Sequence, residues 1–226
     1  MRTKALLCAA ATLAVCAATS MAQNVYSLNT VGYVTAVPGN GNFIAICNPV
    51  TNTSVANTLD NLVRSNTPIN AQVLKWNYGA VHFDIYQRVS FGNGWSPTTG
   101  AAASLNPGEG VFLKSPSATN ITFVGDVLDA KYYGLQTNSL RSGFELVGSK
   151  QPLTDSITNI GLLIPFSSSP QNQLLKWNVG AQHYDIFSRV SFGSGWSPSV
   201  PTNNVGEGFF TKLAAPYTWV QNFTVQ

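Results

Sequence analysis

Charged side chains are scarce in this 226-residue sequence, where they make up 9% of the residues. About 25% is typical of a soluble domain. The charges are also nearly balanced, because 10 basic and 9 acidic residues remain once Arg2 and Lys4 of the N-terminal segment are set aside. Such a chain has no long-range attraction for a phosphate backbone or an anionic membrane surface. We therefore predict that nucleic acid is not a partner.

Cysteine is the second shortage. The chain has three, and Cys8 and Cys16 lie in the N-terminal segment, which leaves Cys47 alone. A single thiol cannot form a disulfide within the chain. Cys47 lies in the apolar run FIAIC, and we expect it to be a small buried side chain.

The N-terminal segment has the three parts of a secretory signal. Arg2 and Lys4 give a basic start, residues 5–18 are apolar, and Ser20-Met21-Ala22 offers a small-residue cleavage site. The apolar run is short for a membrane span, and an uncleaved N-terminal anchor is the less favoured alternative. We predict a signal peptide over residues 1–22 and no transmembrane segment after its removal.

One stretch of the chain occurs twice. Residues 74–97 read LKWNYGAVHFDIYQRVSFGNGWSP and residues 175–198 read LKWNVGAQHYDIFSRVSFGSGWSP, so that 18 of 24 aligned positions are identical. The likeness extends upstream, where Phe43 aligns with Phe144, and downstream to a Gly-Glu-Gly segment in each copy. The mature chain is therefore an internal duplication, and we place its repeats at residues 23–127 and 128–226.

The repeats have the composition of β-structure. Each has about 100 residues, enough to bury a core of its own, and consists of β-branched and aromatic runs that glycine, proline and asparagine interrupt. We predict a mainly β fold in which two tandem repeats form small sandwich-like or barrel-like lobes that pack together. A single fused two-sheet body is the alternative.

One short helix is expected in each repeat. In the first, Thr53 or Ser54 would cap a helix whose apolar residues at 55, 59, 62 and 63 share one face. In the second, the equivalent segment runs from Thr154 to Pro165.

The repeated stretch predicts a strand over residues 72–77, a turn at Tyr78-Gly79 and a second strand over residues 81–91. Alternation in the second strand divides its residues between two faces, and the same division recurs 101 residues later. We expect the apolar face to be the inner one. That face carries Val81, Phe83, Ile85, Val89 and Phe91, and the other carries His82, Asp84, Tyr86, Arg88 and Ser90.

The order of KWN, a Gly-Trp-x-Pro turn and a Pro-Gly-Glu-Gly segment before aromatic residues resembles uncharacterised secreted β-rich repeat proteins of Gram-negative environmental bacteria. The residues that carry this resemblance are Trp95, Leu105, Pro107, Gly108, Gly110 and Phe112, and in the second copy Trp196, Gly206, Gly208 and Phe210. The second copy departs from the pattern, with Val205 in place of the proline. The resemblance covers nearly the whole mature chain and implies an exported, non-enzymatic β protein, with no catalytic residue to carry over.

Each repeat places a histidine and an aspartate on one strand face, as His82 with Asp84 and as His183 with Asp185. A catalytic histidine needs a nucleophile beside it, but Ser90 lies eight residues away and no Gly-x-Ser-x-Gly turn occurs. Two ligands per repeat are also fewer than a metal site requires. We predict no catalytic residue, metal or cofactor here. The four residues, with Arg88 and Arg189, remain candidates for ligand binding.

Glu109 and Glu207 are a second pair to consider, because glycoside hydrolysis uses two carboxylates at a defined separation. Both lie between glycines, where a carboxylate more often accepts backbone N–H groups and holds the turn. We favour the role in the turn, and we expect that the protein is not an enzyme.

Trp76, Trp95, Trp177 and Trp196 are the aromatic candidates. An exposed indole can stack on a sugar ring while polar neighbours bind its hydroxyl groups, and a scarcity of charge suits neutral glycans. A tryptophan after a tight turn can equally fill the core of a small β domain. Both interpretations stay open at this point.

The terminal strands, over residues 25–37 and 219–225, have few charges that would prevent pairing with other chains. We expect an exported, non-catalytic protein with a structural or adhesive role in the periplasm, at the cell surface or outside the cell. Its expected partners are extracellular polysaccharide or other copies of itself. A bivalent carbohydrate-binding module with tryptophan platforms is the alternative, and a hydrolase is the third choice.

Overall fold

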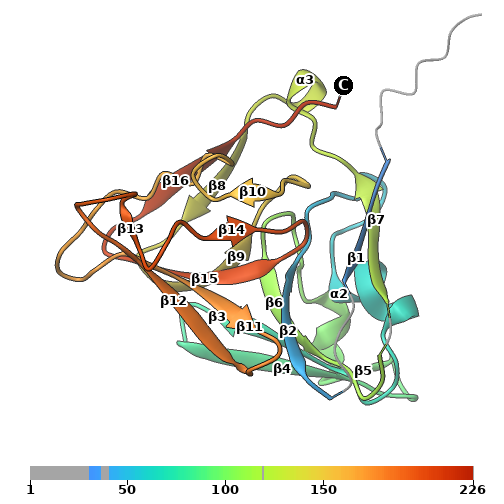
Figure 1. Cartoon of the computed structure of the whole chain (residues 1–226). Helices are drawn as coiled ribbons and strands as arrows, with labels where there is room; N and C mark the ends of the chain where they lie inside the picture. Colours follow the sequence, from blue (N-terminus) through green and yellow to red (C-terminus); the bar gives the residue numbers. More distant parts are fainter. Residues whose placement is uncertain (1–30, 37–40, 119, 226) are drawn as a thin grey trace, which may run out of the picture.

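The computed structural model describes residues 31–36, 41–118 and 120–225, and its main feature is a pair of five-stranded antiparallel sheets, one in each repeat (Figure 1). The first sheet has the order β2-β6-β3-β4-β5, and the second has the equivalent order β9-β15-β11-β12-β13. The prediction of a mainly β fold with two related lobes is confirmed. The strands are β2 (Phe43–Cys47), β3 (Gln72–Asn77), β4 (His82–Arg88), β5 (Trp95–Ser96), β6 (Gly110–Lys114), β9 (Gly143–Gly148), β11 (Gln173–Asn178), β12 (His183–Arg189), β13 (Trp196–Ser197) and β15 (Gly208–Leu213).

Three antiparallel ribbons of two strands complete the β-structure. In the first repeat β1 (Val31–Ala36) pairs with β7 (Ile121–Asp126), and in the second β8 (Gln136–Leu140) pairs with β16 (Tyr217–Gln221). A short ribbon joins β10 (Asp155–Ser156) to β14 (Thr202–Asn203). The terminal strands therefore each pair along one edge, although residues 25–30 and 37 of the predicted first strand lie outside the described residues.

Helical segments are short. α2 (Leu59–Val63) begins after Thr58, whose hydroxyl accepts the Asn61 N–H at 3.3 Å, so the cap lies later than Thr53 or Ser54. The 3-10 helices η1 (Arg64–Asn66) and η2 (Thr98–Ala102) also belong to the first repeat. α3 (Ala130–Tyr133) follows β7, where the chain passes from one repeat to the other.

The helix predicted for residues 154–165 was wrong. The chain there forms the two residues of β10 and then a series of turns. The Thr154 hydroxyl donates to the Asn203 carbonyl at 3.1 Å instead of capping a helix. Gly161 has a φ of 86°, which interrupts any helical path before Pro165.

Each lobe has a core of its own. One cluster of buried residues includes Leu59, Val73, Trp95 and Phe123 from the first repeat. The second includes Leu162, Leu174, Trp196 and Trp219 from the second repeat. The two lobes are joined by a third cluster, described below, so they pack as one body.

The predicted assignment of inner and outer faces in β4 was partly wrong, because residues of both faces pack against protein, although Ile85 in mid-strand is exposed. Phe83 packs into the cluster between the lobes, while Tyr86 and Arg88 on the opposite face lie against the core of their own lobe. The apolar residues toward the strand ends are exposed, with Phe91 at 71% and its counterpart Phe192 at 72%. Alternation separates two faces, but it does not show that the polar one is solvated.

The third cluster, which we call the shared aromatic cluster, draws on both repeats. It is centred on the buried side chains of Phe112, Leu146 and Phe210, and the partly buried members are Phe43, Ala45, Leu74, Trp76, Phe83, Leu175, Trp177 and Tyr184. The ring centroids of Trp76 and Phe210 are 5.3 Å apart, and those of Trp177 and Phe112 are also 5.3 Å apart. The contact is therefore reciprocal, as in a two-fold interface.

Backbone contacts repeat the same symmetry. The Gly148 N–H donates to the Gly108 carbonyl at 3.0 Å, and the Cys47 N–H donates to the Gly206 carbonyl at 2.8 Å. Each Gly-Glu-Gly turn thus reaches the edge strand of the other lobe. In Figure 1 the orange strands of the second sheet lie against the blue and green strands of the first.

In the part of the chain that the structure describes, no helix is long and apolar enough to cross a membrane. The predicted signal peptide, residues 1–22, lies outside that part.

Candidate functional site

Trp95 and Trp196 are core residues, exposed to only 1% and 4%. The guanidinium groups of Arg88 and Arg189 lie over these indoles at 5.2 Å and 5.1 Å from the ring centroids. Each arginine also donates through Nη1 to the carbonyl of the glycine before the tryptophan. The arginines thus stabilise the turns, and the tryptophans pack in the cores of the two lobes. No indole face is left open for a sugar, which corrects their assignment as ligand-binding candidates.

Trp76 and Trp177 lie in the shared aromatic cluster. Each indole N–H donates across the contact between the lobes, Trp76 to the Phe144 carbonyl at 2.9 Å and Trp177 to the Phe43 carbonyl at 2.8 Å. Their first role is therefore to join the two repeats. Trp76 additionally lines the pocket described below.

The histidine–aspartate pairs are on the surface. His82 Nε2 lies 3.2 Å from Asp84 Oδ1, and His183 Nε2 lies 3.3 Å from Asp185 Oδ1. Each aspartate also accepts the side-chain amide of an asparagine on the neighbouring strand. Among the described residues, no group of three or more His, Cys, Asp and Glu side chains could hold a metal ion. The pairs thus stay surface candidates with only two ionisable groups each.

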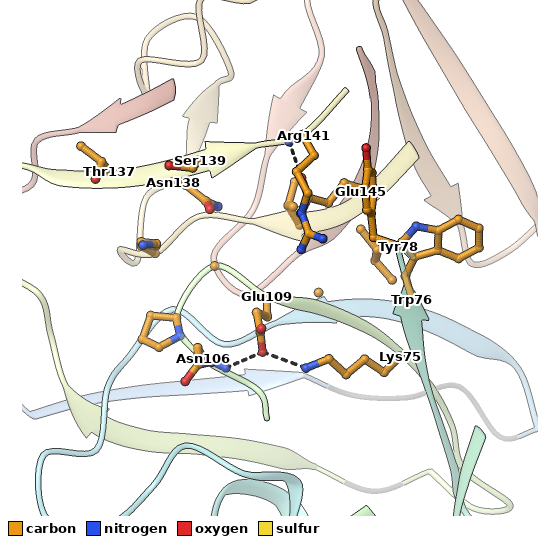
Figure 2. Close-up of a pocket in the computed structure, with 16 residues that line it drawn as sticks. Lys75, Trp76, Tyr78, Asn106, Glu109, Thr137, Asn138, Ser139, Arg141 and Glu145 are labelled. Atoms are coloured by element: carbon orange, nitrogen blue, oxygen red, sulfur yellow. Dashed lines mark hydrogen bonds and ion pairs between the residues drawn. The ribbon is translucent and has the colours of Figure 1, made fainter. Parts of the chain in front are cut away.

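A concavity of the described chain lies between the lobes, and we call it the inter-lobe pocket (Figure 2). It has a volume of about 480 Å³, within the usual range for small-molecule sites. Its walls come from the end of β3, from the first Gly-Glu-Gly turn, and from β8, β9 and the short connection between them in the second repeat. The lining residues are Lys75, Trp76, Tyr78, Asn106, Pro107, Gly108, Glu109, Gly110, Thr137, Asn138, Ser139, Arg141, Glu145, Leu146, Val147 and Lys150.

Glu109 is the best-anchored charge on the first-repeat side of the pocket. Its Oε2 atom accepts the Lys75 ammonium at 3.0 Å, the Asn106 N–H at 2.8 Å and the Ser104 hydroxyl at 3.1 Å. Burial alone would raise the pKa of this carboxyl, but Lys75 and these hydrogen bonds outweigh it and lower the pKa below its usual value. Glu109 is therefore a fixed anion and a poor general acid.

The second-repeat side carries another ion pair. Glu145 accepts Arg141 Nε at 3.0 Å and the Arg141 backbone N–H at 2.7 Å. The same guanidinium lies over the Tyr78 ring at 4.4 Å from its centroid, and the Tyr78 hydroxyl donates to the Ser142 carbonyl at 2.8 Å. Figure 2 shows this group above Lys75, Asn106 and Glu109. The pocket is thus held in shape from both repeats.

Sequence analysis missed most of this site. It considered Trp76 as a platform and Glu109 as a turn residue, but Tyr78, Arg141 and Lys150 were not singled out. The usable signal was the difference between the copies, because Val179 replaces Tyr78 within a nearly identical stretch and Pro49 replaces Lys150. Comparison with models of known families, with curated proteins and with solved structures gave no match.

Proposed function

We propose that this is an exported, non-catalytic protein with an adhesive role, and that it binds extracellular polysaccharide in the inter-lobe pocket. The observation that carries the proposal is the make-up of the pocket. Five charged side chains line it in a chain where only 9% of residues are charged. Such a concentration of polar groups favours a ligand that is itself rich in hydrogen-bonding groups.

The pocket offers both donors and acceptors around one concave space. Arg141 and Lys150 donate, the carboxylates of Glu109 and Glu145 accept, and Asn138 can do both, whereas the three N–H groups of the Lys75 ammonium are already taken by Ser104 and Glu109. Edges of Trp76 and Tyr78 supply apolar surface beside them. Hydroxyl groups on a sugar ring need this mixture, since each of them both donates and accepts.

A non-catalytic role fits the state of the carboxylates. Each pocket glutamate is already tied to a cation, and the lowered pKa of Glu109 is the opposite of what a glycosidase acid needs. Glu109 and Glu207 are also not a pair across one site. Glu109 pairs with Lys75 next to Val147, whereas Glu207 pairs with Lys176 next to Ile46.

The test uses retention of the mature chain, residues 23–226, on a panel of insoluble and gel-embedded polysaccharides. Ser139→Trp places a large side chain at an exposed position of the pocket wall and should abolish retention. Thr35→Trp is the matched control, because Thr35 precedes the last residue of β1 as Ser139 precedes the last residue of β8. Thr35 lines a different crevice, which also includes Val34 and Val205. Thermal melting confirms that both variants are folded. Retention of Ser139→Trp equal to wild type, or no retention of any polysaccharide, would overturn the proposal.

Self-assembly is the second candidate function, and a separate observation favours it. Phe91 and Phe192 are exposed at equivalent turns, and Ile85 and Ile186 are exposed on the preceding strands. Both pairs are identical in the two copies although packing does not require it. Sedimentation velocity of the wild type and of Phe91→Ser/Phe192→Ser distinguishes the cases. Assembly requires a concentration-dependent larger species that the double variant lacks.

A further inference from the structure

The reciprocal packing of the repeats creates two crevices with the same backbone plan. Gly108 on one side and Gly206 on the other both have a positive φ and accept a backbone N–H from the opposite lobe. A Cβ atom on Gly108 would lie 2.8 Å from Asn138 Nδ2, and one on Gly206 would lie 2.6 Å from Val34 Cγ1. Asn138 pairs with Trp219 as Val34 pairs with Phe123, so these neighbours are equivalent too.

The chemistry of the two crevices nevertheless differs. Four polar residues of the inter-lobe pocket have apolar equivalents in the other copy. Val179 is equivalent to Tyr78, Val34 to Asn138, Ile44 to Glu145 and Pro49 to Lys150. Of these four equivalents, Val34 lines the opposite crevice, whose lining is mainly apolar and includes Val31, Tyr33, Val127, Pro152, Val205, Phe223 and Val225. The Lys75–Glu109 pair recurs in the second copy as Lys176–Glu207, but Glu145 and Lys150 have the uncharged equivalents Ile44 and Pro49, so the shared fold does not explain these two charges.

One of these charges has no partner. Lys75 is paired with Glu109 and Arg141 with Glu145, whereas the Lys150 ammonium makes no ion pair or hydrogen bond with any residue that the structure describes. Three cations and two anions leave the pocket with a single positive charge. A ligand that brings one negative charge would balance it.

Lys150 is also held in place by buried groups. Its backbone N–H donates to Gln221 Oε1 at 2.9 Å, and the fully buried Gln221 donates to the Ser149 hydroxyl at 2.7 Å. The missing side chain of Gly108 leaves room for its aliphatic stem, since a Cβ there would lie 2.7 Å from Lys150 Cγ. Burial lowers the pKa of the Lys150 ammonium despite the nearby Glu109, so an anionic partner would stabilise the protonated form.

We propose that the ligand of the inter-lobe pocket is a carboxylate-bearing sugar, a uronate, whose carboxylate binds Lys150. This inference rests on the proposed saccharide-binding function and makes it specific. The surrounding Asn138, Ser139 and Asn106 groups remain for the hydroxyl groups of the same ring or of its neighbours.

Titration calorimetry with matched trimers tests the inference. The probes are trimers of galacturonate, glucuronate and mannuronate, each compared with the neutral trimer of the corresponding hexose. We expect at least one uronate to bind tenfold or more tightly than its neutral counterpart, because a hydrogen bond to a charged group contributes at least that factor. Lys150→Gln should remove this preference. Lys131→Gln, which deletes an exposed cation on α3 far outside the pocket lining, should retain it.

The two proposals fail in different ways. Equal binding of neutral and acidic trimers, or a uronate preference that survives Lys150→Gln, would overturn the uronate inference and leave saccharide binding intact. Absence of binding by every trimer, acidic and neutral, would overturn both.

Discussion

Replacement of the two buried tryptophans by phenylalanine should destabilise the lobes unequally. Trp95→Phe and Trp196→Phe remove the same atoms from equivalent places, and an arginine covers each indole at nearly the same distance. The packing loss of a few kcal/mol that accompanies such a truncation should therefore be similar at both sites. A difference between the variants would report on the indole N–H groups.

The environments of the two N–H groups are opposite. Trp95 Nε1 donates to Asp60 Oδ1 at 3.0 Å, and that carboxylate is also paired with Arg64. Trp196 Nε1 is buried and has no partner among the described residues. The residue 101 positions after Asp60 is Gly161, which has no side chain to offer.

Loss of a hydrogen bond to a charged acceptor costs about 1.5–3 kcal/mol, and a buried donor without a partner costs about 1–3 kcal/mol. Trp95→Phe loses the hydrogen bond to the Asp60 carboxylate. Trp196→Phe instead removes a buried N–H that has no partner among the described residues. Because Asp60 is partly exposed and keeps Arg64, we take the lower part of these ranges. Trp95→Phe should therefore lower the free energy of unfolding by about 2.5–4 kcal/mol more than Trp196→Phe does.

Urea unfolding followed by far-UV circular dichroism measures this difference without relying on the tryptophan signal. Asp60→Ala supplies the control, since Trp95→Phe on that background should cost about as little as Trp196→Phe. Equal destabilisation by the two single variants would refute the reasoning. It would mean that the Asp60 hydrogen bond contributes nothing net or that water reaches Trp196.

Three further predictions concern the shared aromatic cluster, the thiol and a pocket carboxylate. Phe112→Ala and Phe210→Ala should each lower the free energy of unfolding by about 3–5 kcal/mol, and melting should stay a single transition because both lobes use these rings. Cys47 should resist a thiol reagent at pH 8 until urea is added, since burial raises its pKa well above the usual range; fast labelling of the native protein would contradict this. The lowered pKa of Glu109 stabilises the fold above about pH 4.5, and this stabilisation is lost as the pH falls. Urea midpoints measured against pH should therefore fall less steeply below that value in Glu109→Gln than in wild type.

Local structure was predictable where neighbouring residues decide it. The prediction of a strand over residues 72–77 matches β3, and the second strand, predicted over residues 81–91, is β4, which ends earlier, at Arg88. The repeated sequence correctly indicated that the second repeat would form the same hairpin, which is β11–β12. Gly92 and Gly94, which have positive φ, lie in the turn that leads to Trp95.

Contacts between the repeats were not predictable from such local patterns. Residues of both faces of β4 pack against protein, because a second sheet lies on one face, and a period of two residues cannot reveal that. The inter-lobe pocket joins three segments, around Lys75, Glu109 and Lys150, that only the packing of the lobes brings together. The second-repeat helix failed for a related reason: Ile157 and Ile160 are buried from a series of turns instead, while Leu163 is exposed.

The shared aromatic cluster also has a consequence for how the chain is made. Phe112 meets Trp177, and Trp76 meets Phe210, so the aromatic side of the first repeat stays uncovered until nearly the whole polypeptide has been synthesised. A nascent first repeat therefore exposes apolar surface of the kind that holding chaperones bind. The late completion of this cluster fits the export that the N-terminal segment predicts, because an exported chain is threaded through the membrane before it folds.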